Sequence, residues 1–295
     1  MSVIAYAYEP AAHLYVTGED AADFLQSQFS NELRPFESGR SSYGLWLDVK
    51  GRVVADSWIY CEDAERFRII SERSDGALIR EKLESHIVAD EVEIESGAPL
   101  AGLAVIGSTP DASSRASLDG ALILESRRAG SQSRDIFFPD ATSREDFLSA
   151  SGLEAVRGMR FDAERVRAGI AGLHAEVCVG DMPGEAGLVG TVVSLTKGCF
   201  LGQEVVARMH HVGRPQRGLF LVRGDGPLPQ RLSGMENEEG KTLGELRTVL
   251  AADGGWQGVA MLKTRYAEAG LRLSIDEKQG CATVVGPFGA AHQDD

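Results

Sequence analysis

The side chains with the most chemical potential gather between Met182 and Arg217. This segment contains four cations, Lys197, Arg208, Arg214 and Arg217, in a chain whose formal net charge is −14. Guanidinium groups pair with carboxylates as a fork, so the segment suits a site for the anionic groups of a ligand. Its glycines, among them Gly184, Gly187, Gly190, Gly198 and Gly202, let its backbone turn tightly and approach a ligand closely. The alternative is a turn-rich linker with solvated charges.

Cys199 is the candidate nucleophile or ligating thiol of this segment. Lys197 precedes it by two residues, and a nearby cation favours the reactive thiolate. The alternative is a buried, inert cysteine. His210 and His211 alone do not establish a Cys–His pair. The four cysteines form no C-x-x-C pair and the histidines show no H-x-x-x-H spacing, so no metal site is predicted.

A second candidate group lies on a predicted strand, Arg52–Tyr60, which is rich in β-branched and aromatic residues. The period of two places five residues on one face, Arg52, Val54, Asp56, Trp58 and Tyr60. Asp56 is therefore a candidate catalytic residue, which we expect to be partly desolvated beside two aromatic rings. An edge-strand acid in water is the alternative reading.

The elements that must position these residues have clear signals. Apolar residues four apart predict a helix over Ala21–Leu33, with Asp20 as its N-cap. Ser74-Asp75 caps a second predicted helix. Five strand-like pieces follow Pro215: Gly218–Arg223, Thr242–Leu250, Gln257–Leu262, Leu271–Ile275 and Ala282–Val285. They predict a small antiparallel barrel or sandwich, so we place a domain boundary near residue 214.

Composition excludes several classes of protein. The chain has 295 residues, 43% of them hydrophobic, which is typical of globular proteins. Its 30 basic and 44 acidic residues argue against direct binding of nucleic acid or anionic lipid over the whole surface. The sequence shows no apolar run long enough to span a membrane and no secretory signal, so we expect a cytoplasmic protein.

Several motifs resemble one known family. Lys197–Glu204 reads K-G-C-F-L-G-Q-E and resembles the K-G-C-[FY]-x-G-Q-E signature of the YgfZ family. That family belongs to the superfamily of the glycine-cleavage T-protein, GcvT, a tetrahydrofolate-dependent aminomethyltransferase. The stretches Gly18–Leu33, Gly51–Asp56 and Glu185–Leu188 are also similar to motifs of the superfamily. For the segment from about residue 107 to 150 we identify no motif that resembles the family.

The resemblance implies an α+β fold, with a folate-binding body over residues 1–213 and a C-terminal antiparallel β-barrel over residues 214–295. It implies tetrahydrofolate in a central channel, Fe/S-dependent client proteins, and a role in iron–sulfur cluster assembly or repair that affects tRNA modification. Glu185, in the E-A-G-L position, would accept the paired N–H groups of a pterin. The folate tail would meet Arg208, Arg214 or Arg217. Lys197 and Tyr60 complete the expected folate site, with Cys199 as a functional thiol.

Two other functions stay open at this point. One is a true aminomethyltransferase of the T-protein type, and the other is a non-catalytic interaction scaffold. The cysteine signature favours an accessory protein, because T-proteins do not carry it. T-proteins also carry two adjacent acids where this chain has Ala55-Asp56. We therefore do not expect a classical turnover enzyme, and any activity would be folate-dependent aminomethyl transfer.

Overall fold

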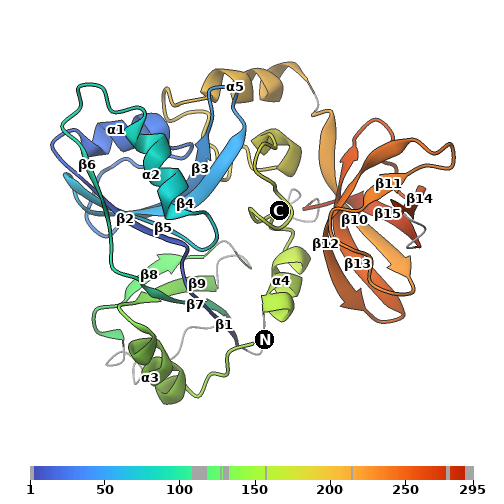
Figure 1. Cartoon of the computed structure of the whole chain (residues 1–295), viewed down its shortest axis with the longest axis horizontal. Helices are drawn as coiled ribbons and strands as arrows, with labels where there is room; N and C mark the ends of the chain where they lie inside the picture. The colour runs from blue at the N-terminus through green and yellow to red at the C-terminus, as the bar shows by residue number, and fades with distance from the viewer. Residues whose placement is uncertain are drawn as a thin grey trace. The chain divides into compact units, whose positions relative to one another are not determined.

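The computed structural model describes residues 3–107, 118–126, 128, 133–156, 158–213, 215–276 and 280–289. The chain divides into two compact units. Unit 1 comprises Met1–Ala168 and Gly190–Gln203, and unit 2 comprises Gly169–Val189 and Glu204–Asp295. Whereas the sequence predicts one boundary near residue 214, these units interleave along the chain. Figure 1 shows their elements.

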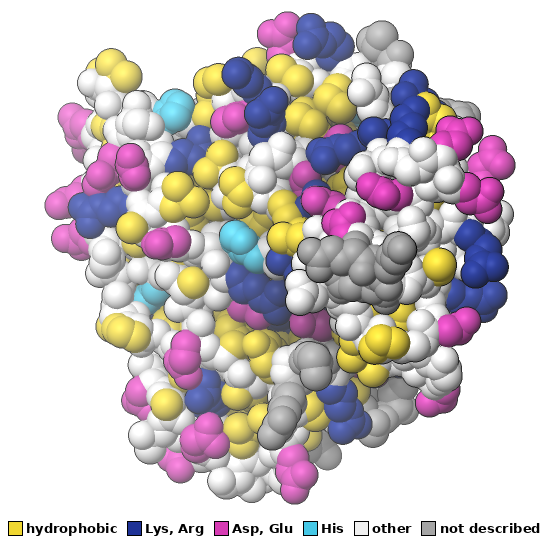
Figure 2. Space-filling view, turned by 45° about the vertical axis from the view of Figure 1, so that its right-hand side comes forward, with side chains coloured by type: hydrophobic (Ala, Val, Ile, Leu, Met, Phe, Trp, Pro, Cys, Tyr) yellow, Lys and Arg dark blue, Asp and Glu magenta, His cyan; other side chains and the backbone are white. Residues whose placement is uncertain are grey.

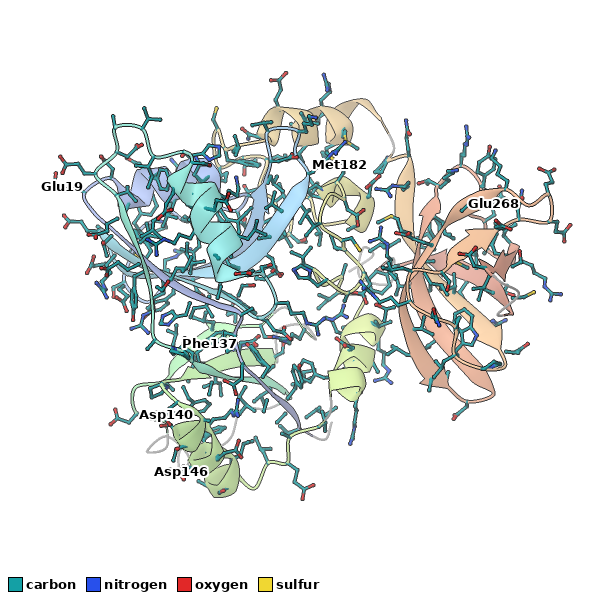
Figure 3. The ribbon with its side chains drawn as sticks, in the orientation of Figure 1. Glu19, Phe137, Asp140, Asp146, Met182 and Glu268 are labelled. Atoms are coloured by element: carbon teal, nitrogen blue, oxygen red, sulfur yellow. The ribbon has the colours of Figure 1, made fainter. Side chains whose placement is uncertain are left out.

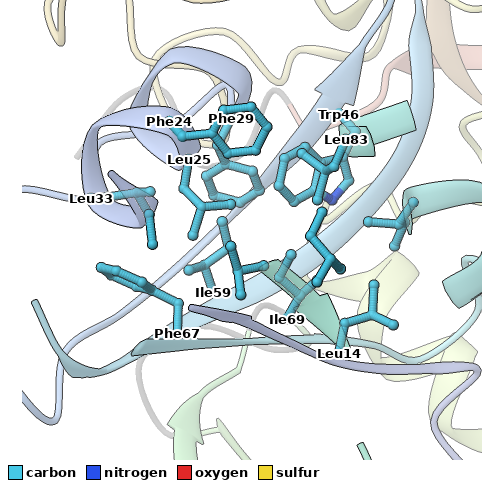
Figure 4. Packing of buried hydrophobic residues seen from close by; sticks show 14 of the residues in the cluster. Leu14, Phe24, Leu25, Phe29, Leu33, Trp46, Ile59, Phe67, Ile69 and Leu83 are labelled. Atoms are coloured by element: carbon cyan, nitrogen blue, oxygen red, sulfur yellow. The ribbon is translucent and has the colours of Figure 1, made fainter. Parts of the chain in front are cut away.

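A five-stranded antiparallel sheet, in the order β3-β4-β5-β2-β6, forms the first half of unit 1. Its strands are β2 (Ala12–Thr17), β3 (Ser41–Leu47), β4 (Val53–Asp63), β5 (Arg66–Ser71) and β6 (Glu93–Ser96). Two helices, α1 (Ala21–Gln28) and α2 (Gly76–Glu84), contribute apolar side chains to the core on one face of this sheet. Figure 4 shows that core, in which Leu25 of α1 lies near Ile59 and Phe67 of the sheet.

Helix α1 is shorter than its apolar stripe predicts. It ends at Gln28, because Phe29 adopts an extended backbone and forms a bridge with Trp46 of β3. The expected N-cap, Asp20, makes no side-chain capping bond, and its carboxylate accepts the backbone N–H of Glu91 at 2.7 Å. In α2 the predicted cap is confirmed, since Asp75 accepts the N–H of Ala77 at 2.8 Å.

A second antiparallel sheet in unit 1 has the order β1-β7-β9-β8. Its strands are β1 (Ile4–Tyr8), β7 (Ala101–Ile106), β8 (Leu122–Glu125) and β9 (Ser133–Phe138). One face packs against the five-stranded sheet through Trp58 and Phe137, and the other packs against α3 (Ala141–Ser151). Helix α4 (Gly158–Arg167) follows. Unit 1 is therefore layered as helices, sheet, sheet and helix.

Unit 2 contains a closed antiparallel barrel, drawn in orange to red in Figure 1. Its strands are β10 (Arg217–Asp225), β11 (Gly234–Glu236), β12 (Thr242–Ala252), β13 (Gly255–Lys263), β14 (Arg272–Ile275) and β15 (Cys281–Pro287). The five predicted pieces are all strands, and β11 was missed because it has only three residues. The expected α+β fold with a C-terminal antiparallel barrel is confirmed.

The segment Gly169–Val189 belongs to the barrel unit because polar contacts join the two. The hydroxyl of Thr248 donates to Glu176 at 2.6 Å, and Arg231 donates to the carbonyl of Ala175 at 2.8 Å. Asp181 pairs with the buried Arg247 at 3.0 Å. These contacts arise from side chains distant in sequence, so strand patterning did not indicate them.

Two further properties concern the surface and the membrane. On the face drawn in Figure 2, Lys and Arg side chains are scattered among Asp and Glu side chains. Within the described ranges, no helix is long and apolar enough to cross a membrane.

Candidate functional site

Glu185 lies in a short 3₁₀ turn, η2 (Pro183–Ala186), which follows Met182 (labelled in Figure 3). The turn ends at Gly187, whose φ of 67° is a left-handed conformation that glycine adopts without strain. The Glu185 carboxylate accepts the backbone N–H of Met182 at 3.1 Å. The residue is only 8% exposed. The sequence reading of Glu185 as a solvated turn glutamate is therefore excluded.

Arg217, at the start of β10, faces this carboxylate as a fork. Its Nε donates to Oε1 of Glu185 at 2.9 Å, and its Nη2 donates to Oε2 at 2.7 Å. Nη2 also lies 3.2 Å from Asp181, which pairs in turn with Arg247. The hydrogen bond to Glu185 raises the pKa of Arg217, against the opposing effect of burial. Four side chains of alternating charge thus form a row, which we call the charge row: Glu185, Arg217, Asp181 and Arg247.

Two pockets border the turn within unit 2. The larger, of about 640 Å³, is lined by Glu185 and by the three cations Arg217, Lys263 and Arg265, with Pro215, Gln216 and Thr264 between them. The smaller, of about 250 Å³, is lined mainly by apolar side chains and glycines, including Met182, Val206 and Met209. The arrangement offers a carboxylate acceptor, cations for anionic groups and an apolar surface for a ring.

Asp56 lies on β4 in unit 1, within a cage of hydroxyl groups. Its carboxylate accepts hydrogen bonds from Ser74 at 2.6 Å, from Ser71 at 3.2 Å and from Tyr43. Its backbone N–H donates to the Ser74 hydroxyl at 3.1 Å. Asp56 is recognisable in the sequence, but its three hydroxyl donors are not, because they come from β3, β5 and the loop before α2.

The face of β4 that carries Asp56 turns toward the second sheet. Trp58 donates to the carbonyl of Glu125 at 3.1 Å, and Tyr60 packs against the same cluster. The predicted alternation holds for these residues. It fails at Val54, which packs with the opposite core because a register shift in the pairing of β3 with β4 occurs there.

Lys197 is 2% exposed, which the sequence did not indicate. Its ammonium donates to three backbone carbonyls, those of Gln26 at 2.7 Å, Phe29 at 2.5 Å and Asn31 at 2.8 Å. Gln26 lies in the last turn of α1, and the other two residues follow its end. Burial lowers the pKa of Lys197 to about 7, partly opposed by Glu32. Carbonyl acceptors favour the charged ammonium. All three ammonium hydrogens have backbone partners, so Lys197 stabilises the chain around α1.

Cys199 is exposed, whereas Lys197 and Phe200 of the same signature are buried. A Cβ atom on Gly202 would lie 2.5 Å from the carbonyl oxygen of Asp48, and the φ of Gly202 is +83°. Gly198 also has a left-handed φ, of +101°. Cys199 therefore lies in a loop whose backbone conformation requires glycine at positions 198 and 202. The alternative of a buried cysteine is excluded.

The other expected site residues are distributed as follows. The structure brings Glu185 and Arg217 together in unit 2. Arg208 is exposed on α5 (Gln203–Val212), and Arg214 lies outside the described residues. In the described part of the chain, no three His, Cys, Asp or Glu side chains are grouped to hold a metal ion.

Comparisons with known proteins place these features in context. Residues 2–117 match the model of the GCVT N-terminal domain. The chain is 31% identical to the mitochondrial iron–sulfur cluster assembly factor IBA57 of Homo sapiens, over 90% of this chain and 75% of that protein. It is 26% identical to the tRNA-modifying protein YgfZ of Edwardsiella ictaluri, over 95% of this chain and 90% of that protein. The crystal structure of glycine cleavage system aminomethyltransferase T from Bartonella henselae has a similar fold, with a TM-score of 0.80, 17% identity, and coverage of 97% of this chain and 86% of that chain.

Proposed function

This chain belongs to the YgfZ family within the GcvT superfamily, and from that premise we propose that it binds tetrahydrofolate and acts in iron–sulfur cluster assembly or repair. The observation that carries the folate part is the Glu185 carboxylate at the wall of a 640 Å³ pocket with three cations. The assembly part rests on the relatives named as an assembly factor and a tRNA-modifying protein. An effect on tRNA modification would follow through Fe/S-dependent client proteins in the cytoplasm.

The residues present fit a folate. The edge of a pterin carries a ring N–H beside a 2-amino group, and one carboxylate can accept both hydrogen bonds. The pair of hydrogen bonds that Glu185 accepts from Arg217 supports this proposal, because both carboxylate oxygens accept from two parallel N–H donors. Lys263 and Arg265 line the same pocket and suit the carboxylates of a folate tail. Bound tetrahydrofolate would supply one-carbon chemistry, while these side chains bind and orient it.

Binding and turnover are separable in this proposal. The Asp56 carboxylate already accepts three hydroxyl hydrogen bonds, which favours a role in organising β3, β4 and β5 over that of a free acid. We therefore expect no aminomethyl transfer from the glycine-cleavage carrier protein. Robust turnover in that assay would replace the accessory role with an enzymatic one.

Calorimetric titration with 5-formyltetrahydrofolate, a stable reduced folate, tests the binding site. Glu185→Gln loses the charge and replaces one acceptor with a donor, so affinity should fall by at least about tenfold, or about 1.4 kcal/mol. Glu268→Gln, at an exposed acid labelled in Figure 3, is the matched control and should bind like wild type. Equal affinities for all three proteins would remove Glu185 from the site.

A further inference from the structure

The acceptors that a pterin needs on Glu185 are already occupied by a group of the same shape. The Nε–Cζ–Nη2 edge of Arg217 is a planar pair of parallel N–H donors, and both Glu185 oxygens accept from it, at 2.9 and 2.7 Å. A pterin edge has the same N–C–N arrangement. The Met182 N–H takes a further position on Oε2. Arg217 and the pterin edge therefore require the same positions on one carboxylate.

From this geometry we infer that Arg217 is an internal competitor, which occupies Glu185 as a mimic of the ligand's N–C–N edge and is displaced when the ligand binds. The inference rests on the proposed folate site. It changes the role expected for Arg217, since a residue that forks onto the pterin anchor is not placed to hold the opposite, carboxylate end of a folate.

The surroundings of Arg217 give it a second position. Asp181 lies 3.2 Å from the same Nη2, and it is held by Arg247, whose side chain is 2% exposed. When Glu185 turns to a ligand, Arg217 keeps Asp181 as its partner. The Arg217 side chain is 39% exposed and borders the 640 Å³ pocket, so it has space to move.

The competition also selects among ligands. A heterocycle with both the ring N–H and the 2-amino group replaces both hydrogen bonds that Arg217 gives up. An analogue without the amino group replaces only one and leaves a nearly buried carboxylate oxygen without that donor, which is costly. The competition thus favours heterocycles that present a ring N–H beside an amino group, such as pterins.

The test compares two ligands and three variants by calorimetry. The ligands are 5-formyltetrahydrofolate and a reduced pterin without the aminobenzoyl-glutamate tail. Arg217→Met removes the fork, Arg217→Lys keeps a cation without the fork, and Arg265→Met removes another cation from the same pocket. In wild type, only the fraction of molecules in which Arg217 has left Glu185 can bind the ligand, and this lowers the apparent affinity. Arg217→Met removes the competition and should bind both ligands about three- to tenfold more tightly. Arg217→Lys should be intermediate, and Arg265→Met should not bind the tail-free pterin more tightly.

Three results would overturn the inference. Weaker binding of both ligands by Arg217→Met would mean that Arg217 orients Glu185. Weaker binding of the tail-bearing ligand alone would mean that Arg217 holds the tail. Failure of wild type and every variant to bind either ligand would remove the proposed folate site together with the competitor. As an independent readout, low millimolar guanidinium chloride should weaken pterin binding to Arg217→Met more than to wild type, and equal effects would also count against the inference.

Discussion

Replacement of Lys197 by methionine tests whether the first residue of the K-G-C-F-L-G-Q-E signature supports the fold. Methionine keeps an unbranched chain of similar volume and removes only the ammonium group. In the structure that ammonium donates to the carbonyls of Gln26, Phe29 and Asn31. The substitution leaves these three acceptors without their donor in a site where Lys197 is 2% exposed.

The magnitude follows from two opposing effects. Each buried carbonyl that loses its donor costs about 1–3 kcal/mol. The substitution also removes a charge whose burial destabilises the folded chain, and this offsets part of the lost free energy of unfolding. We expect the free energy of unfolding of Lys197→Met to fall by about 3 kcal/mol, and its melting temperature by about 6–12 °C at 2–4 °C per kcal/mol.

Urea unfolding followed by circular dichroism, together with thermal scans, measures both quantities. Lys50→Met is the matched control, because Lys50 is exposed in the turn before β4, and it should unfold like wild type. If Lys197→Met stayed within about 0.5 kcal/mol of wild type, the typical range for a surface substitution, the three carbonyl contacts would not stabilise the chain and the reasoning would be wrong.

Three other outcomes are expected. Cys199→Ser should keep its folate affinity and melting temperature, because the thiol is exposed, and yet fail to restore Fe/S enzyme activity in cells that lack the native protein; full rescue would contradict a functional thiol. Asp56→Asn should lower the free energy of unfolding by about 1–3 kcal/mol, because an amide NH₂ replaces one of the carboxylate oxygens that accept from the surrounding hydroxyl groups. An unchanged urea midpoint would argue against the cage. The pKa of Lys197 is about 7 in the folded chain and about 10.4 in the unfolded chain, so the unfolded state binds more protons between these two pH values. The stability of wild type relative to Lys197→Met should therefore increase as the pH rises from about 7 to 10. A stability difference that does not change with pH would contradict this.

Local patterns in the sequence determined much of the architecture. The β-strand pieces after Pro215 were recognisable because alternation and turn residues are local properties. Asp75 was recognised as a cap for the same reason, since its partner Ala77 is two residues away. The signature motif identified Cys199 and the E-A-G-L motif identified Glu185, but neither motif indicated which residues these two contact.

Only the tertiary structure decided what those residues contact. The sequence predicts Lys197 as a folate-site cation that favours the Cys199 thiolate, yet its ammonium is buried against carbonyls more than 160 residues earlier in the chain. The apolar stripe extends α1 to Leu33, but these contacts and the bridge from Phe29 to Trp46 stop it at Gln28. Glu185 was expected at the pterin, and Arg217 was one of three arginines expected at the opposite end of the ligand, yet the fold pairs the two residues with each other. Such pairings join residues far apart in sequence, and they depend on how sheets and turns pack, which hydrophobic periodicity does not encode.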